Sequence, residues 1–454
     1  MSQSTYASST AEGGKLGAVF SRGSGLGNYS ITSQSFITVD PANLNSGQNI
    51  LIPKGFVAIV SAGGSVDSAV AAVQVGLGIG DNGVLLVEQD ITGPGIGQNS
   101  SFGLNWVIVG DGLVHNITLM ARTNVIADAC VIVNSTPTNS PYLLIEITQS
   151  SFTGVSTFAS SLSEAQGKLG GFVQTGSGAG NYTSASTAFQ PVDGGGKQLT
   201  ITTLIPRGFM LLIAAGGVVG STQAAAAVAV GLTVDGVLKT EQDFSPHGTT
   251  QLSAFGLSYA VLGDGGYHSI VLVYRTSSTN VTIGNNSATH VPFIMAELTQ
   301  SNFNGIQTDA SSLSEGGKLG CIFLTGAGTG NYQTNSQSFI NVDSNLLSQS
   351  LIVPKGYVLM VSAAGVAGTA TAAVPVAVGI TVDGVLVVET DLQGAAAGNL
   401  VGFDVQYMIV GDSLAHTVAM VYRTNATADN AVIGNNSATN VPSLLLELTQ
   451  SNLN

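Results

Sequence analysis

Charged residues are scarce in this chain. Of its 454 residues only 12 are basic and 26 are acidic, which makes 8% in all, against roughly 25% in an average soluble domain. Because an uncharged surface loses little hydration free energy when it is covered, this composition favours packing against other proteins. The net charge of −14 has the wrong sign for binding nucleic acid or anionic lipid, so we expect neither partner.

Cysteine is almost absent, and the sequence predicts neither a secretory signal nor a membrane span. Cys130 and Cys321 occupy non-equivalent places, so we expect free buried thiols and no disulfide framework or cysteine metal site. The N-terminal residues have neither a basic nor an apolar segment, which predicts synthesis in a cytoplasm without secretion. The uncharged stretch 208–234 could span a bilayer by length, but polar residues 221–223 and several glycines interrupt it and favour strands.

Long helices are disfavoured because the chain has 59 glycines, and each costs about 1 kcal/mol in a helix relative to alanine. What the chain has instead is a threefold internal repeat of about 150 residues per copy. Each copy carries Gly-Lys-Leu-Gly, Gly-Asn-Tyr, a Pro-Lys/Arg-Gly-aromatic turn and a closing Glu-Leu/Ile-Thr-Gln-Ser. Repeats of this length are whole domains rather than solenoid units. The predicted domains are 1–150, 151–301 and 302–454, each opening with a linker-like segment.

Short apolar runs alternate with Gly, Asn, Asp and Pro turns within each repeat. In the third repeat two such runs are separated by Asp383-Gly384, a hairpin turn that needs positive φ. Further strands begin at His416 and after Pro442. The pattern of about eight to ten short strands per repeat predicts an all-β fold of three tandem antiparallel β-sandwich or jelly-roll domains.

The final third of each repeat resembles the trimeric jelly rolls of the tumour-necrosis-factor and complement type that occur in bacteriophage virion appendages, such as head fibres and decorations. In the third repeat the resemblance is carried by His-Thr-Val-x-Met-x-Tyr-Arg-Thr from His416, by Ile433–Ala438, and by Val441-Pro442 before a closing apolar strand. The first repeat departs from the pattern at 133–136. The resemblance implies a jelly-roll fold and a virion setting.

Such jelly rolls associate in threes, and this implies that the three copies close as an intramolecular pseudo-trimer. The chain also begins, at 4–9, with the motif that links its first two copies at 156–161. We expect the neutral segments Ala224–Val230 and Thr369–Val378 to form the contact between copies. A rod of three separate domains is the alternative.

Three histidines recur a few residues after an aspartate. An acid–base pair repeated three times is a catalytic hypothesis, but no Ser or Cys in a nucleophile-elbow context accompanies it. We therefore interpret the aspartate as the cap of a turn and the histidine as the start of a strand, its ring covering the barrel end or contacting a backbone carbonyl. No enzyme activity, cofactor or metal site is predicted. The histidines are His115, His268 and His416.

Two carboxylates at positions i and i+2, followed later by an arginine, also recur in each copy. Such a pair points to one face of a strand and could bind Ca²⁺ or serve a glycosidase, but it offers too few oxygens for calcium, which takes about six to eight. We favour a solvated strand edge and a structural ion pair with the arginine. The residues are Glu88, Asp90 and Arg122; Glu241, Asp243 and Arg275; and Glu389, Asp391 and Arg423.

The sequence thus predicts a structural protein of a bacteriophage virion, namely a head decoration, head fibre, or collar or tail appendage. Its expected partners are capsid or tail proteins and further copies of itself. The alternative is a receptor- or carbohydrate-binding adhesin whose loops hold a host-surface glycan. Trp106 is the only tryptophan and no aromatic cluster recurs, which disfavours the adhesin.

Overall fold

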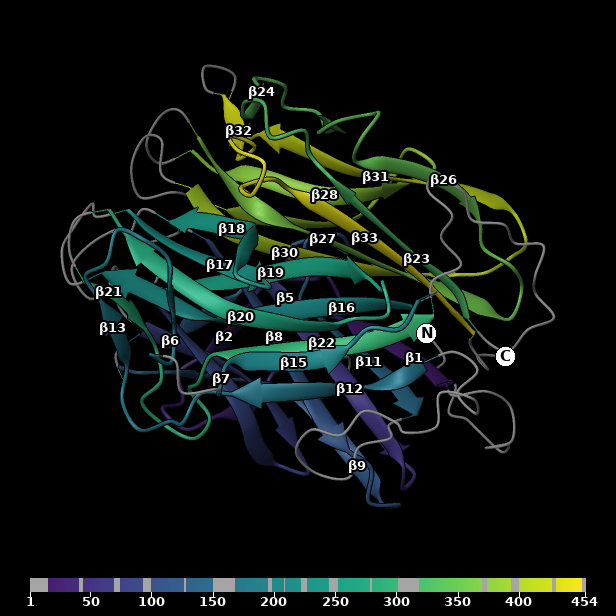
Figure 1. Cartoon of the computed structure of the whole chain (residues 1–454), viewed down its shortest axis with the longest axis horizontal. Helices are drawn as coiled ribbons and strands as arrows, with labels where there is room; N and C mark the ends of the chain where they lie inside the picture. Colours follow the sequence, from purple (N-terminus) through teal and green to yellow (C-terminus); the bar gives the residue numbers. More distant parts are fainter. Residues whose placement is uncertain are drawn as a thin grey trace.

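In the computed structural model every described element is a β-strand, and the strands form three similar sets of eleven (Figure 1). No helix among the described residues is long and apolar enough to cross a membrane. The linker motifs at 4–9 and 156–161 lie outside the described residues. The structure describes residues 15–40, 44–68, 74–92, 99–125, 128–149, 168–194, 198–207, 209–221, 227–244, 252–277, 280–300, 318–369, 374–392, 400–426 and 430–450.

The three repeats place their strands at equivalent positions. Repeat 1 contains β1 (Lys15–Arg22), β2 (Tyr29–Ile31), β3 (Ile37–Thr38), β4 (Asn45–Leu51), β5 (Phe56–Ser68), β6 (Gln74–Asp81), β7 (Val84–Thr92), β8 (Ser100–Val109), β9 (Val114–Thr123), β10 (Cys130–Ile132) and β11 (Tyr142–Gln149). Repeat 2 contains β12 (Lys168–Thr175), β13 (Tyr182–Ser184), β14 (Gln190–Pro191), β15 (Thr200–Leu204), β16 (Phe209–Ser221), β17 (Val228–Val234), β18 (Val237–Phe244), β19 (Leu252–Leu262), β20 (Tyr267–Thr276), β21 (Val281–Ile283) and β22 (Phe293–Gln300). Repeat 3 contains β23 (Lys318–Thr325), β24 (Tyr332–Thr334), β25 (Ile340–Asn341), β26 (Ser348–Ile352), β27 (Tyr357–Thr369), β28 (Val376–Val382), β29 (Val385–Leu392), β30 (Leu400–Val410), β31 (Ala415–Thr424), β32 (Ala431–Ile433) and β33 (Ser443–Gln450).

Each repeat folds into two antiparallel sheets. In repeat 1 the six-stranded sheet has the order β1-β11-β5-β10-β2, with β8 also paired to β5. The five-stranded sheet has the order β3-β9-β6-β7, with β4 also paired to β9. Repeats 2 and 3 reproduce this order strand for strand, and every sheet draws its strands from one repeat. The predicted all-β sandwich fold is therefore confirmed.

In each five-stranded sheet, the hairpin that joins the edge strand to its neighbour carries the turn that the sequence predicted. Asp383 and Gly384 have φ angles of 53° and 77°, and Asp235 and Gly236 have the same pair of values. Positive φ at both central residues is the backbone of a type I′ turn, whose twist matches that of the strands it joins. The turn fixes the register of β28 with β29 and of β17 with β18.

Each sandwich has its own apolar core between the two sheets. Alternate residues of a strand point to opposite faces, so one side of each strand supplies the core. In repeat 1 the core includes Leu77, Leu104 and Leu143 from β6, β8 and β11, each fully buried. Cys130 lies in this core as a free thiol, and Cys321 is a free buried thiol in repeat 3.

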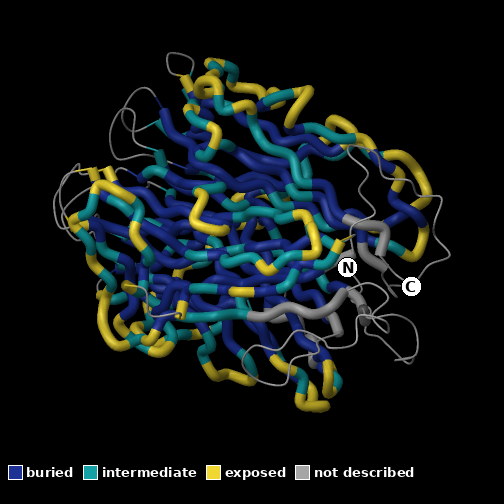
Figure 2. The backbone as a smooth tube through the Cα atoms, viewed as in Figure 1, coloured by how far each residue is buried: buried dark blue, intermediate teal, exposed yellow. Residues whose placement is uncertain are grey.

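The three sandwiches pack around a common pseudo-threefold axis instead of forming a row. One strand from each repeat, β8, β19 and β30, contacts the other two. Figure 1 shows strands from all three repeats crossing the middle of the molecule. Figure 2 shows that the backbone there is buried and that exposed residues lie mainly in the peripheral turns and loops.

Ala224–Val230 and Thr369–Val378 were expected to form the contact between repeats, and for their described residues this is wrong. Val230 and Val378 are fully buried in the cores of their own sandwiches. The apolar clusters that join repeats use the outer face of the six-stranded sheets instead, because the inner face is already occupied by the sandwich core. One cluster joins repeats 1 and 2 through Val57, Ile59, Val107, Phe293 and Met295, and another joins repeats 2 and 3 through Met210, Leu212 and Cys321.

We expect small-angle X-ray scattering to give a radius of gyration of about 23 Å, the value for one globular body of this length. Three 150-residue domains that touch in a row would give about 34 Å on the same scaling. A measured value near the larger figure would contradict the closed arrangement.

Candidate functional site

The edge strand of each five-stranded sheet is covered by a loop of a neighbouring repeat. An uncovered edge presents unpaired backbone groups that can recruit a foreign strand. Here β7, β18 and β29 each donate a backbone N–H to a threonine carbonyl of the covering loop, so repeat 1 is joined to repeat 2, repeat 2 to repeat 3, and repeat 3 to repeat 1. The bonds run from Glu88 N to Thr289 O (2.8 Å), from Glu241 N to Thr439 O (2.7 Å) and from Glu389 N to Thr138 O (2.8 Å).

The carboxylates of the edge strand bind the same loop. Between repeats 2 and 3 the hydroxyl of Thr439 donates to Glu241 Oε1 at 2.7 Å. The amide of Asn440 donates to Asp243 at 3.1 Å. Arg275 lies 3.2 Å from both carboxylates and offsets part of their charge. A charged cluster in this position is stabilising only because each carboxylate oxygen is paired or hydrogen-bonded.

The other two interfaces repeat this arrangement with small differences. Each arginine guanidinium also lies 5.0 Å from the centre of a phenylalanine ring of its own repeat, a cation–π geometry. The contacts are Ser287 and Thr289 to Glu88 (3.2 and 2.8 Å) and Arg122 to Asp90 (2.9 Å) at one interface, and Thr138 to Glu389 (3.0 Å), Asn139 to Asp391 (2.7 Å) and Arg423 to Glu389 (3.5 Å) at the other.

A solvated strand edge was expected for these carboxylates, and that expectation is wrong. They do lie on edge strands, but the neighbouring repeat covers those strands. Glu88, Glu241 and Glu389 are only 9%, 8% and 9% exposed. Carboxylate–arginine ion pairs occur in all three repeats, within each repeat and beside the interface.

Burial shifts the pKa values of side chains at the interfaces, and the shifted groups differ from one interface to the next. Burial, helped by the charge of Glu389 and opposed by that of Arg423, raises the pKa of Asp391 to about 6. At the interface of repeats 1 and 2, His290 stands where the other loops have Asn139 and Asn440. Burial holds the pKa of His290 below its ordinary value, so this ring is neutral at pH 7.

Each of the three recurring histidines is held between two aspartates. His416 Nδ1 lies 2.7 Å from Asp383 Oδ2, and its Nε2 lies 3.1 Å from Asp412 Oδ1. The hydrogen bond to Asp383 is the main reason that the pKa of His416 is raised. The expected turn cap is present, since Asp412 accepts from Leu414 N at 2.8 Å, but the ring binds carboxylates and not a backbone carbonyl. The same clamp joins His115 to Asp81 and Asp111, and His268 to Asp235 and Asp264.

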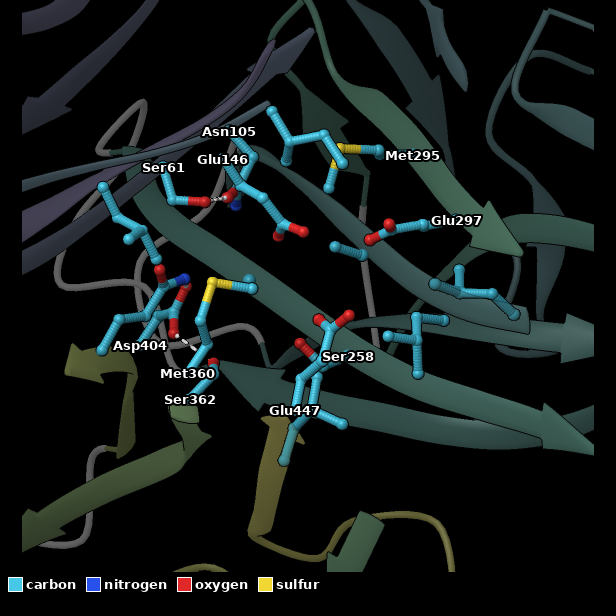
Figure 3. A pocket seen from close by; sticks show the side chains of 18 of the residues that line it. Ser61, Asn105, Glu146, Ser258, Met295, Glu297, Met360, Ser362, Asp404 and Glu447 are labelled. Atoms are coloured by element: carbon cyan, nitrogen blue, oxygen red, sulfur yellow. Dashed lines mark hydrogen bonds between the residues drawn. The ribbon is translucent and has the colours of Figure 1, made fainter. Parts of the chain in front are cut away.

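A second set of carboxylates meets on the pseudo-threefold axis. Glu146 on β11 is opposite Ile59 on β5, which is opposite Val107 on β8, so the three side chains share one row on the outer face of the sheet. The equivalent rows of repeats 2 and 3 contain Glu297 and Glu447. Figure 3 shows the three carboxylates directed toward one another, and one oxygen of each lies within 4.8 Å of the others. All three residues are buried.

These glutamates line a cavity of about 110 Å³ that also extends along the next rows of the three sheets. The next row brings Asn105, Ser258 and Gln406 to the cavity wall. Ser61 donates to Asn105 Oδ1 at 2.5 Å. The wall is therefore polar along part of its length and apolar where the leucine and methionine side chains of the same rows reach it.

In the next row of side chains beyond Asn105, Ser258 and Gln406, an aspartate from only one repeat lies near the axis. Asp404 occupies the place where the other repeats have Gly103 and Gly256, and a side chain at Gly103 would contact it. Ser362 and Gln406 donate hydrogen bonds to its two oxygens, at 3.2 and 3.3 Å. Burial raises the pKa of Asp404 to about 6.

Sequence reasoning found the edge carboxylates, the arginines and the histidines but missed the axial glutamates. The signal was present in the closing motif, where one glutamate interrupts an otherwise apolar strand in every repeat. A lone charge on a buried strand is costly unless it is paired or bound. Only the packing of the three sheets brings these repeated charges together at the axis.

No protein family matches this sequence, and no curated protein matches it. Among solved structures the chain is similar to an insecticidal delta-endotoxin, Cry8Ea1 from Bacillus thuringiensis, at 10% identity and a TM-score of 0.20, with 61% of this chain and 53% of that chain covered. It thus spans about half the length of the endotoxin.

Two further structures are covered more fully. PNGF-II matches at 9% identity and a TM-score of 0.22, over 87% of this chain and 99% of that chain. A triple jelly-roll protein of an archaeal virus turret matches at 10% identity and a TM-score of 0.16, over 95% and 91%. Superpositions this poor carry no argument about function.

We expect Glu241→Ala to lower the free energy of unfolding by about 2–3 kcal/mol, because Arg275 and the hydroxyl of Thr439 lose a buried acceptor. Lys239→Ala, two residues earlier on β18, is the matched control and should change stability by less than about 0.5 kcal/mol. Urea unfolding followed by circular dichroism measures both. Equal effects of the two variants would show that the interface carboxylate contributes nothing specific.

Asp404→Asn should stabilise the protein at pH 8 by on the order of 1–3 kcal/mol. The folded pKa of about 6 lies above the ordinary 3.8, so wild-type stability falls as pH rises through this range and a charge must be buried. At pH 4 the group is largely protonated in the folded state, so the difference should shrink. Thermal unfolding at both pH values tests this, with Asp343→Asn as a control, since the pKa of Asp343 is lowered.

Proposed function

We propose that this chain is a structural protein of a bacteriophage virion, in the role of a head decoration, head fibre, or collar or tail appendage. Its work in this proposal is assembly: it binds capsid or tail proteins and further copies of itself, without catalysis and without a cofactor. The scarcity of charge and the closure of three domains within one chain support a part that is built to pack against others.

A cluster of exposed apolar side chains at one end of the molecule carries the proposal. We call it the apolar end, and it is formed where β8, β19 and β30 finish and where the neighbouring hairpins turn. Val109, Leu262 and Val410 are 55%, 60% and 56% exposed there. Concentrated exposed apolar surface marks protein-binding sites. The other members are Leu51, Val84, Leu113 and Val114 of repeat 1, Val237 and Tyr267 of repeat 2, and Ile352, Val385 and Leu414 of repeat 3.

The strand pairing shows that these positions belong to one end. Leu51, at the end of β4, is opposite Val114, at the start of β9. Val109, at the end of β8, is opposite Val57, near the start of β5. Five of the 17 large apolar residues that are exposed among the described residues lie elsewhere, namely Leu26, Ile37, Val125, Ile340 and Leu346. Leu26 is at the opposite end, in the loop after β1 that bonds to the backbone of Asn134 and Pro141.

The histidine clamps lie at this same end. His416 joins the turn that precedes Val385 to the turn that contains Leu414. A binding surface on turns loses conformational entropy when a partner orders it. The clamps reduce that loss because the turns are already fixed to one another.

Three equivalent patches around one axis support attachment at several points. Weak contacts of one patch add when the three bind together, since the second and third contacts form within one complex. An appendage that attaches in this way needs no single strong site.

Mass spectrometry of purified virions of the phage that encodes the chain tests the proposal. We expect the protein in the particles at a constant ratio to the major capsid protein. Consistent absence from particles would overturn the proposal. A glycan array tests the adhesin alternative, and tight binding of one glycan by a chain that is absent from virions would favour it.

Substitution at the apolar end makes the test sharper. The triple variant Val109→Asp, Leu262→Asp and Val410→Asp should reduce incorporation into virions at least tenfold, because each charge must be desolvated on binding. Leu26→Asp, at the opposite end, should be incorporated like wild type. Gel filtration checks that both variants fold, and normal incorporation of the triple variant would remove the apolar end from the proposal.

A further inference from the structure

We propose that the edge contact between repeats 1 and 2 opens when His290 takes up a proton, while the other two edge contacts stay closed. An edge contact is the covering of β7, β18 or β29 by the loop of a neighbouring repeat. The opening is local, because the apolar cluster that joins repeats 1 and 2 contains no titratable group. The inference is independent of the proposed function.

His290 belongs to the loop of repeat 2 that covers β7, at the place where the other two loops have asparagine. Asn139 donates to Asp391 of its edge strand at 2.7 Å. Asn440 donates to Asp243 of its edge strand at 3.1 Å. Within the described part of the chain Nε2 of His290 has no hydrogen-bond partner. The edge contact of repeats 1 and 2 therefore lacks a bond that the other two have.

The ring of His290 is neutral in this position, with its proton on Nδ1. Nδ1 lies 2.8 Å from Asn286 Oδ1, and an amide oxygen only accepts hydrogen bonds, so Nδ1 is the donor. Nε2 is then a buried acceptor. His290 is 3% exposed, and a Cβ at Gly284 would lie 2.6 Å from its Cε1. The ring thus packs closely against the backbone of its own loop.

Gln89, on β7, is a second buried side chain of this edge contact that is poorly satisfied. It is 2% exposed, and its Nε2 donates to Gly217 O of repeat 2 at 3.4 Å. Its Oε1 has no hydrogen-bond partner among the described residues. The equivalent Gln242 donates to Gly365 O at 3.1 Å and accepts from Gly256 N at 3.3 Å. Both ends of the amide are thus satisfied at β18 and only one at β7.

The edge contact of repeats 1 and 2 is the least well bonded of the three. Among the described residues each of the other two has one buried atom without a partner, on Arg275 or on Asp391, against two here. The contact of repeats 3 and 1 also has a bond from Arg22 to Val387 O at 2.8 Å, and the equivalents of this arginine are threonines. Unsatisfied buried groups cost free energy, so opening is easiest at β7.

The charged groups that face His290 come from two strands of repeat 1. Burial is the largest influence on the ring and lowers its pKa. Asp90 and Glu88 on β7 raise the pKa, and Arg122 on β9 lowers it, so that the pKa of His290 stays below the ordinary 6.5. In the open state the ring is in water and regains its ordinary pKa. The open state therefore takes up a proton that the closed state resists.

Acid favours the open contact for this reason. As pH falls through 6.5 the ring becomes charged in the open state and stays neutral in the closed one, so the equilibrium moves toward opening. Asp90 acts in the opposite direction, because burial raises its pKa in the closed state. Burial also raises the pKa of Asp243 and of Asp391 at the other two contacts. The aspartate effect is common to all three contacts, and the histidine distinguishes the first.

Hydrogen–deuterium exchange of the full chain, measured by mass spectrometry at pH 7.5 and pH 5, tests the proposal. The amides of Glu88, Glu241 and Glu389 bond across the three edge contacts, so peptides from β7, β18 and β29 report the opening of each. After correction for the intrinsic pH dependence of exchange, acid should raise opening at β7 by about threefold to thirtyfold relative to β18 and β29. The upper figure is the charged-to-neutral ratio at pH 5 of a ring whose pKa is about 6.5. Equal responses of the three strands would overturn the proposal.

Two reciprocal substitutions identify the titrating group. His290→Asn gives the first edge contact the asparagine of the other two and should abolish the extra opening of β7 in acid. Asn440→His should transfer the acid response to β18, because repeat 3 has Asn436 where repeat 2 has Asn286 to accept from the ring. An acid response of β7 that survives His290→Asn would show that another group titrates and would overturn the assignment.

The histidines of the three clamps also take up protons as pH falls. They recur in every repeat, so the comparison of β7, β18 and β29 within one sample removes their effect. Gel filtration at both pH values checks that each variant is folded and that the opening is local. His290→Asn decides the test alone where Asn440→His fails to fold, because two of the three edge contacts already have asparagine at this place.

Discussion

The whole arrangement depends on one contact made three times, in which a loop of one repeat covers the edge strand of the next. The backbone bond at Glu88, Glu241 or Glu389 satisfies an edge that would otherwise be open, and the carboxylate of the same residue binds the loop hydroxyls. Because each repeat both gives a loop and receives one, all three edge strands are covered. Closure brings the six-stranded sheets together and thereby creates the axial cavity.

Much of the fold could be predicted from the sequence, because each turn and strand pattern occurs in three copies that can be compared with one another. Asp383-Gly384 predicted a hairpin turn with positive φ, because the residues of a turn themselves determine which φ angles it can adopt. The burial of Glu241 could not be read in the same way, since what covers β18 is a loop almost 200 residues away in sequence. Carboxylates at i and i+2 look alike whether water or a neighbouring domain lies beyond them.

The position of the axial glutamates could not be predicted from the sequence either, because it also depends on contacts between repeats. Glu146, Glu297 and Glu447 are far apart in sequence, and only the packing of three sheets brings them within reach of one another. The sequence showed a glutamate within an apolar strand, but the groups that surround its carboxylate depend on how the sheets of the other repeats pack against it. The histidine clamps could be predicted in part. His416 and Asp412 belong to one turn, so the sequence shows that they are close. Asp383 comes from another hairpin, and its contact with His416 is visible only in the structure.

The aspartate that stands alone on the axis has a consequence for how such a molecule can change. In a trimer of identical chains every residue near the axis is present three times, so one substitution alters three adjoining positions and a single Asp404 would become three colliding ones. Here two glycines leave room for one aspartate. Joining the three copies in one polypeptide has released the centre of the molecule from symmetry, and each copy can now vary there while the other two accommodate it.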